Sequence, residues 1–349
     1  MKPFLLALLF IAIACTSCVK HETANIIDEG KKAQANRLQT TEEYEVPVRD
    51  GFVTRVSMNE TVLAEAVSPL TILIPRQTGT RAGEGVSLAY IPTSEYPNNI
   101  DLQNNSKLFQ VVCFEDSRQA DYDYNDFVFH VKYQTRGDKF GFIIQPIALG
   151  STKPIKLGCI VYKGQTQLFK GLITEMNSET GEYNDCRTQY FRNQEGMINT
   201  FGKEVNQQEN LHTYMGSSRR TWNMANVADN GAPRVEWYIV VDGNTELYAL
   251  STNYLDQSFD KNGRPYGIVI TDTGSTYKDK YGYVCGKDWF NYPQESTHIQ
   301  DVYPEIWQWL AGNSTYTFSD IYDASNIPVN AYPASDLRLY EVTDAEAIK

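Results

Sequence analysis

An acidic segment that runs directly into a strictly alternating β-strand is the feature that most constrains the fold. Within the predicted strand, side chains at odd positions share one side: Phe127, Phe129, Val131 and Tyr133. Val128, His130 and Lys132 take the other side. Successive side chains of a strand point to opposite faces, so this spacing predicts a strand with one strongly apolar face. Such a face must be covered by a second layer of the protein.

Further β-prone runs indicate the same architecture along most of the chain. They cover residues 44–48, 52–56, 70–75, 140–147, 156–161, 235–241, 246–250 and 267–271. Turns containing Gly and Asn, such as those at 242–244 and 260–263, separate several of them. We therefore expect a mainly β fold, with an antiparallel β-sandwich or jelly-roll-like body. One short C-terminal helix is expected over residues 298–310, where Pro304 must sit in the first turn or break the helix.

The N-terminus has the pattern of a lipoprotein signal peptide over residues 1–18. Lys2 precedes an apolar run at residues 4–14, which is too short to span a bilayer but suits a signal-peptide core. Small residues beside cysteine favour Cys18 as the lipidated residue, with Cys15 as the alternative and an ordinary cleaved signal as another. Residues 19–43 are polar and are predicted to form a tether. The lipid would then hold an exported protein to the outer membrane, on its periplasmic face or at the cell surface.

Charge and composition limit the partners of the folded body. A net charge of −12 with only 31 basic residues argues against nucleic acid and against anionic lipid surfaces. The 23 Tyr and 15 Phe residues favour contact with a glycan or protein, although sheet propensity accounts for them equally well. Cys113, Cys159, Cys186 and Cys285 are too widely spaced for a disulfide framework, so we expect buried thiols or at most one bridge.

The acidic segment supports two structural interpretations. Its carboxylates are Glu115, Asp116, Asp121, Asp123 and Asp126, and they need water, backbone donors or a hard cation to offset their repulsion. Asp121, Asp123 and Asn125 follow the alternation of a calcium loop, and Glu115 or Asp116 would complete a Ca²⁺ site. The loop is not an EF-hand, because Asp126 and Lys132 occupy the positions of its glycine and its last glutamate. In the other interpretation, Asp121, Asn125 and Asp126 accept backbone N–H bonds in Asx-turns.

Two further clusters carry alternative functions. Glycoside hydrolysis needs two carboxyl groups, which could come from Asp121 with Asp126 or from Glu295. No GxSxG, HExxH or Cys/His constellation is present. A C-terminal aromatic cluster is a candidate glycan platform, with core packing as the favoured interpretation; its members are Trp289, Phe290, Tyr292, Trp307 and Trp309.

Four separated blocks resemble the LruC-domain family of exported and surface lipoproteins. They are residues 114–116 with 121–126, residues 196–200, residues 237–243, and residues 289–295 continuing through 299, 303–304 and 307–309. Val302 and Ala120 depart from the family pattern, which has Ala and Gly there. The resemblance implies an LruC-like β domain at 106–313, after an N-terminal β region at 44–105 and before an extension at 314–349. It assigns no activity, so we expect a non-catalytic binding or structural module, with a carboxylate-pair hydrolase as the alternative.

Overall fold

The computed structural model is mainly β, as the sequence predicts. It describes residues 29–58, 61–76, 85–96, 102–118, 121–193, 195–199, 218–271, 277–278, 284–285, 290 and 292–311. The strands are β1 (Thr41–Val46), β2 (Phe52–Met58), β3 (Thr61–Ala66), β4 (Leu70–Pro75), β5 (Val86–Pro92), β6 (Asn105–Phe114), β7 (Phe127–Arg136), β8 (Lys139–Leu149), β9 (Ile155–Lys163), β10 (Thr166–Leu172), β11 (Ile198–Asn199), β12 (Ser218–Asn223), β13 (Pro233–Val241), β14 (Thr245–Tyr248), β15 (Gly267–Thr271), β16 (Tyr277–Lys278) and β17 (Val284–Cys285). The helices are residues 29–37, α2 (Cys186–Phe191), α3 (Leu255–Ser258), α4 (Ile299–Val302) and α5 (Ile306–Leu310), with a 3-10 turn at Thr93–Glu95.

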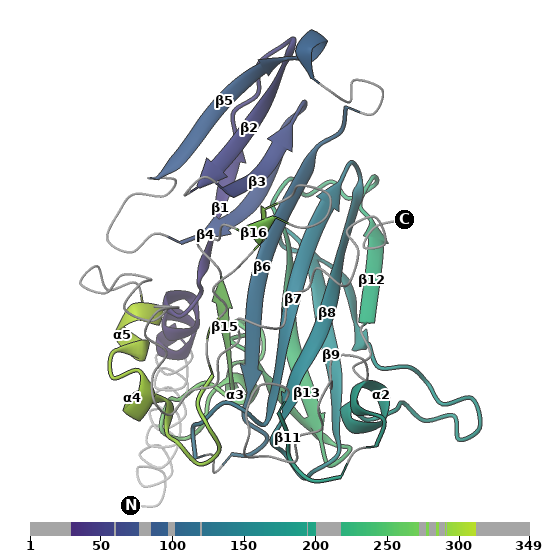
Figure 1. The fold of residues 1–349 in the computed structure, drawn as a ribbon, viewed down its shortest axis with the longest axis vertical. Helices are drawn as coiled ribbons and strands as arrows, with labels where there is room; N and C mark the ends of the chain where they lie inside the picture. The colour runs from purple at the N-terminus through teal and green to yellow at the C-terminus, as the bar shows by residue number, and fades with distance from the viewer. Residues whose placement is uncertain are drawn as a thin grey trace, which may run out of the picture.

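Two antiparallel sheets pack face to face and form the body (Figure 1). The larger sheet has nine strands, in the order β11-β8-β7-β6-β3-β2-β5, with β12 also paired to β8 and β15 to β6. The smaller sheet has the order β10-β9-β13-β14. The side chain of Trp237 in β13 packs against the larger sheet, and its ring centroid lies 4.9 Å from those of Phe129 and Phe142. The core between the two sheets buries the apolar face that the sequence predicts for β7.

Strand β7 is buried on both faces, whereas its sequence predicts only one strongly apolar face. Phe127 and Phe129 pack into the core between the sheets. On the other face, Val128 joins a second core with residues from α4, α5 and the N-terminal segment. His130 also lies on this face and is 1% exposed. Figure 1 shows the helix at residues 29–37 lying between α5 and β15.

The tether prediction is wrong for residues 29–43. Residues 29–37 form a helix, and Ala35 and Leu38 are buried in the second core. These two apolar positions are three residues apart, a spacing that puts them on one side of a helical turn. Gln39 Nε2 donates to the carbonyl of Leu250 at 3.0 Å, and β1 then pairs with β4. The signal peptide, Cys15, Cys18 and residues 19–28 lie outside the described residues.

The N-terminal β region shares a sheet with the rest of the body. Strand β3 pairs with β6 through Ala64 and Ser106, so strands β2, β3 and β5 extend the same nine-stranded sheet. The predicted C-terminal helix is instead two short helices, α4 and α5, separated at Pro304. Proline lacks the N–H that a continuous helix needs, which explains the interruption. In the part of the chain that the structure describes, no helix combines the length and apolar character needed to cross a membrane.

Candidate metal site

The acidic segment connects β6 to β7, the hairpin at the centre of the large sheet. Tyr122 and Tyr124 both adopt left-handed backbone conformations, with φ of 61° and 55°. This conformation is unfavourable for aromatic residues and persists only where contacts hold it. Tyr124 is completely buried and its hydroxyl donates to the carbonyl of Pro265 at 2.7 Å, while the Tyr122 hydroxyl bonds to Asp260. These hydrogen bonds therefore hold the loop around Tyr122 and Tyr124 in its left-handed conformation.

Three carboxylates converge within this loop. Glu115, Asp121 and Asp123 each offer one oxygen, and these atoms lie within 4.8 Å of one another. Ca²⁺ ligands lie about 2.3–2.6 Å from the ion, so two ligands of one ion are no more than about 5 Å apart. Glu115 and Asp123 are buried, whereas Asp121 is exposed. The cluster thus has the spacing of a cation site with one solvent-facing ligand.

The hydrogen bonds of the cluster leave two buried oxygens unsatisfied. Glu115 Oε1 accepts from the Tyr124 N–H at 2.6 Å, and Asp123 Oδ2 accepts from the Ser296 N–H at 2.7 Å. Glu115 Oε2 and Asn125 Oδ1 are buried and have no hydrogen-bond partner in the structure. A buried acceptor without a partner is destabilising, and native proteins rarely leave one unexplained. An oxygen-preferring cation held by the three converging carboxylates would give the Glu115 carboxylate a partner, so these residues fit Ca²⁺.

Burial and mutual repulsion dominate the electrostatics of the cluster. Burial raises the pKa of Glu115 well above its usual value, and the charges of Asp126 and Asp123 raise it further. Burial, followed by the charge of Asp121, raises the pKa of Asp123 to about 8. Burial and the neighbouring Asp116 raise the pKa of Asp126 to about 7. In each case the charged form is disfavoured by the protein around it, and a bound cation would favour that form.

Asp116 and Asp126 brace the ends of the loop. Asp126 Oδ2 accepts from the Asp116 N–H at 2.7 Å. The Asp116 carboxylate pairs with Lys153 Nζ at 2.6 Å and accepts from the Ser151 hydroxyl. Of the three residues predicted to accept backbone N–H bonds, Asp126 does so, whereas Asn125 Oδ1 has no partner. Glu115 and Asp123 accept such bonds as well, which was not predicted.

A distant segment completes the site and was missed as part of it. Glu295, considered only as a catalytic acid, accepts a hydrogen bond from the side chain of Asn125. Its pKa is raised by burial and by the charge of Asp121. The following residue, Ser296, has a φ of 58° and presents its N–H to Asp123. No local pattern connects these positions with a loop so far away along the chain. The resemblance placed Glu295 in its fourth block without linking that block to the loop.

The remaining predicted clusters serve packing in the described residues. Phe290, Tyr292 and Trp309 are buried in the second core, which confirms the packing interpretation for them. Trp307 lies edge-on to Tyr124, with ring centroids 5.9 Å apart, and Trp289 is outside the described residues. The thiols of Cys113, Cys159 and Cys186 are free and buried, as expected; the side chain of Cys285 is outside the described residues.

Comparisons with known proteins do not assign a family. No family model matches the chain, and no curated protein matches it. The crystal structure of a protein from Bacteroides ovatus described as a "putative lipoprotein" is similar with a TM-score of 0.42 and 13% identity, over 83% of this chain and 92% of that one. A likeness at this level supports no conclusion about the present chain, and the resemblance to the LruC-domain family stays a prediction.

Proposed function

We propose that this protein is a non-catalytic cell-envelope lipoprotein whose β body is braced by Ca²⁺ and serves as a binding or structural module. One observation carries the metal part of the proposal. The buried carboxylate of Glu115 leaves Oε2 without a partner, while oxygens of Asp121 and Asp123 lie within 4.8 Å of its own. Without a cation this arrangement combines desolvation with repulsion, and both are costly.

The donor set favours Ca²⁺ over other metals. The converging groups are carboxylate and amide oxygens, which suit hard cations rather than Zn²⁺ or Cu²⁺. Mg²⁺ demands a regular octahedral shell and retains several waters, whereas Ca²⁺ accepts irregular shells of protein oxygens. Glu115, Asp121, Asp123 and Asn125 would hold the ion, with Glu295 beside them. Bound there, Ca²⁺ would tie the end of β6 to the loop and to the segment that precedes α4.

A calorimetric titration of the mature chain without its lipidated cysteine, residues 19–349, tests the metal site. We expect heat of binding with Ca²⁺, a rise in melting temperature, and a much weaker response to Mg²⁺. Asp121→Asn removes one charge at an exposed position and should weaken binding at least tenfold, about 1.4 kcal/mol. Asp138→Asn, also an exposed acid, is the matched control and should bind normally. Absence of both heat and thermal stabilisation in millimolar Ca²⁺ would remove the proposal.

The membrane anchor is supported by the sequence of residues 1–18. Metabolic labelling with a radioactive fatty acid in a Gram-negative host tests it directly. We expect label on the wild-type chain and on the Cys15→Ser variant, and none on Cys18→Ser. Label that survives Cys18→Ser but not Cys15→Ser would move the anchor to the alternative cysteine. Label lost in neither variant would contradict lipidation at this end of the chain.

Hydrolysis by a carboxylate pair is not proposed. Glycosidases place two carboxyl groups on either side of the scissile bond, and that bond must reach them. Here Asp126 already accepts a hydrogen bond from the Asp116 N–H at 2.7 Å, and Asp121 belongs to the carboxylate cluster that the metal proposal assigns to Ca²⁺. A screen of glycan substrates would decide the question, since turnover that is lost in both Asp121→Ala and Asp126→Ala would establish the hydrolase instead.

A further inference from the structure

A cavity of about 510 Å³ lies between the N-terminal segment and one end of the β-sandwich. Its lining comes from the helix at residues 29–37, from β1 and β4, and from strands of both large sheets, including β6, β7 and β13. None of the acidic-loop carboxylates belongs to this lining. Its volume falls in the range of about 300–1,000 Å³ that small-molecule sites occupy. We infer that this cavity, named the interlayer cavity below, binds a neutral saccharide.

The charges of the interlayer cavity cancel. Three basic and three acidic residues line it: Lys32, Lys107, Arg234, Glu42, Glu43 and Glu236. Arg234 is paired with Glu236 at 2.8 Å, so part of this charge is already neutralised. The whole chain, in contrast, carries a net charge of −12. A charged ligand would therefore lose its hydration without gaining a net opposite charge, which favours a neutral ligand.

The polar lining matches hydroxyl groups. Five amide side chains line the cavity: Asn36, Gln39, Gln110, Gln134 and Gln165. Each amide carries two donor hydrogens and one acceptor oxygen, and a sugar hydroxyl is likewise both donor and acceptor. Hydroxyl side chains such as Thr41 and Thr252 add to the set. Such a concentration of neutral hydrogen-bonding groups suits a polyhydroxylated ligand.

An apolar wall completes the match to a sugar ring. Leu108, Tyr133, Phe140 and Val235 also line the cavity, where the buried core between the sheets reaches it. The rings of Tyr133 and Phe140 are stacked, with centroids 6.2 Å apart and planes inclined by 5°. Saccharide binding uses such surfaces because a pyranose presents C–H groups on its faces and hydroxyls around its rim. Tyr133 is held in place, since its hydroxyl accepts from Trp237 Nε1 at 2.7 Å.

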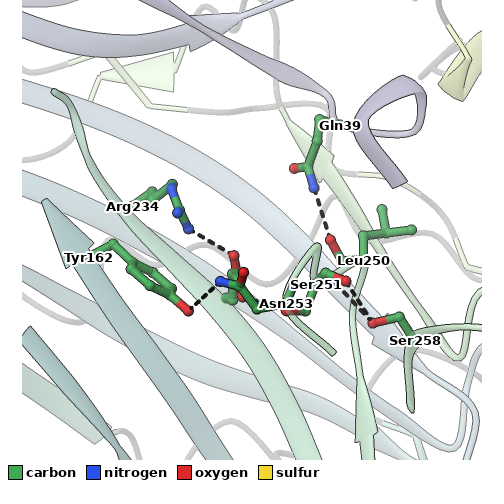
Figure 2. A network of polar contacts seen from close by, with 8 residues as sticks. Gln39, Tyr162, Arg234, Leu250, Ser251, Asn253 and Ser258 are labelled. Atoms are coloured by element: carbon green, nitrogen blue, oxygen red, sulfur yellow. Dashed lines mark hydrogen bonds and ion pairs between the residues drawn. The ribbon is translucent and has the colours of Figure 1, made fainter. Parts of the chain in front are cut away.

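A hydrogen-bond network fixes the polar side of the cavity (Figure 2). Gln39 reaches across from the N-terminal segment to Leu250 at 3.0 Å. Arg234 lies over the ring of Tyr162 at 3.9 Å, and the hydroxyl of Tyr162 accepts from Asn253 Nδ2 at 3.1 Å. Side chains that are ordered before binding lose little entropy on binding, so the arrangement favours affinity. Because residues 29–46 form one wall, a ligand in the cavity would also hold the N-terminal segment against the body.

Hydrogen-exchange mass spectrometry on the mature chain tests the inference. The probes are neutral gluco-, manno-, galacto-, xylo- and N-acetylglucosamine trisaccharides in α and β linkages, at about 10 mM, well above the ~1 mM dissociation constant of a weak complex. Trigalacturonate and trialanine are the charged and peptide comparisons. We expect at least one neutral trisaccharide to slow exchange in residues 29–46, with the two comparison compounds inert. Excess Ca²⁺ is present in every sample. The calorimetric titration tests the Ca²⁺ site on its own, so the metal proposal and the saccharide proposal can fail independently.

Paired variants locate the binding. Asn36→Ala combined with Gln165→Ala removes exposed amides from two different walls and should weaken the trisaccharide at least fivefold by calorimetry. Gln167→Ala, an exposed amide two residues away and outside the lining, is the matched control and should leave affinity unchanged. The inference is overturned if no neutral trisaccharide changes exchange, if only trigalacturonate or trialanine does, or if the double variant binds as well as the control.

Discussion

Replacing Glu115 with Gln should stabilise the metal-free protein and reduce the stabilisation that Ca²⁺ provides. Glu115 is 1% exposed, and its pKa lies well above the ordinary 4.5. Burial and the charges of Asp126 and Asp123 cause this rise, so folding without metal disfavours the ionised form that the unfolded chain adopts at pH 7.5. Glu115→Gln cannot ionise and should therefore stabilise the metal-free protein, by an amount that grows as the pH rises above 4.5.

The same substitution should reduce the response to Ca²⁺. Wild-type protein at a Ca²⁺ concentration of 100 times the dissociation constant gains about 2.7 kcal/mol. Loss of one carboxylate ligand that weakens binding tenfold leaves about 1.4 kcal/mol of that gain. Chemical denaturation in chelator and in Ca²⁺ measures both quantities, with the exposed-acid variant Glu179→Gln as control. If Glu115→Gln destabilises the metal-free protein and leaves the Ca²⁺ response intact, the carboxylate acts only through its bond to Tyr124 and the reasoning is wrong.

Three further outcomes test the electrostatics and the packing. In chelator, the free energy of unfolding should fall as the pH rises from about 5 to 8, since Asp123 and Asp126, with pKa values of about 8 and about 7, keep protons that the unfolded chain releases near 3.8. Denaturation curves at several pH values measure this, and stability that rises over the range contradicts it. Leu38→Ala should cost about 2–5 kcal/mol of stability, because Leu38 is buried in the second core; an unchanged melting temperature would restore the tether prediction. Trp237→Phe removes the donor to Tyr133 and should cost about 1–3 kcal/mol in urea denaturation, whereas a cost near zero would mean that this bond contributes nothing.

Local pattern predicted many of the strands and the acidic loop, but it missed β3, β5, β6, β10 and β12. The two faces of β7 are separated as the alternation predicts, because the period of two is a property of the strand backbone itself. Asp121 and Asp123 come close to Glu115 because the ends of the connection between residues 115 and 126 are held together by the paired strands β6 and β7. Short-range chemistry of this kind can be recognised from residue types and spacing.

The sequence by itself therefore determined that this is a β protein with an acidic, oxygen-rich hairpin connection, and it indicated an N-terminal anchor. Only the tertiary structure decided that helix 29–37 packs on the body, that β7 is covered on both faces, and that Glu295 and Ser296 meet the loop. These outcomes depend on which surfaces far apart in the chain bury one another. That choice is made by the free energy of packing the whole molecule, and no window of neighbouring residues contains it.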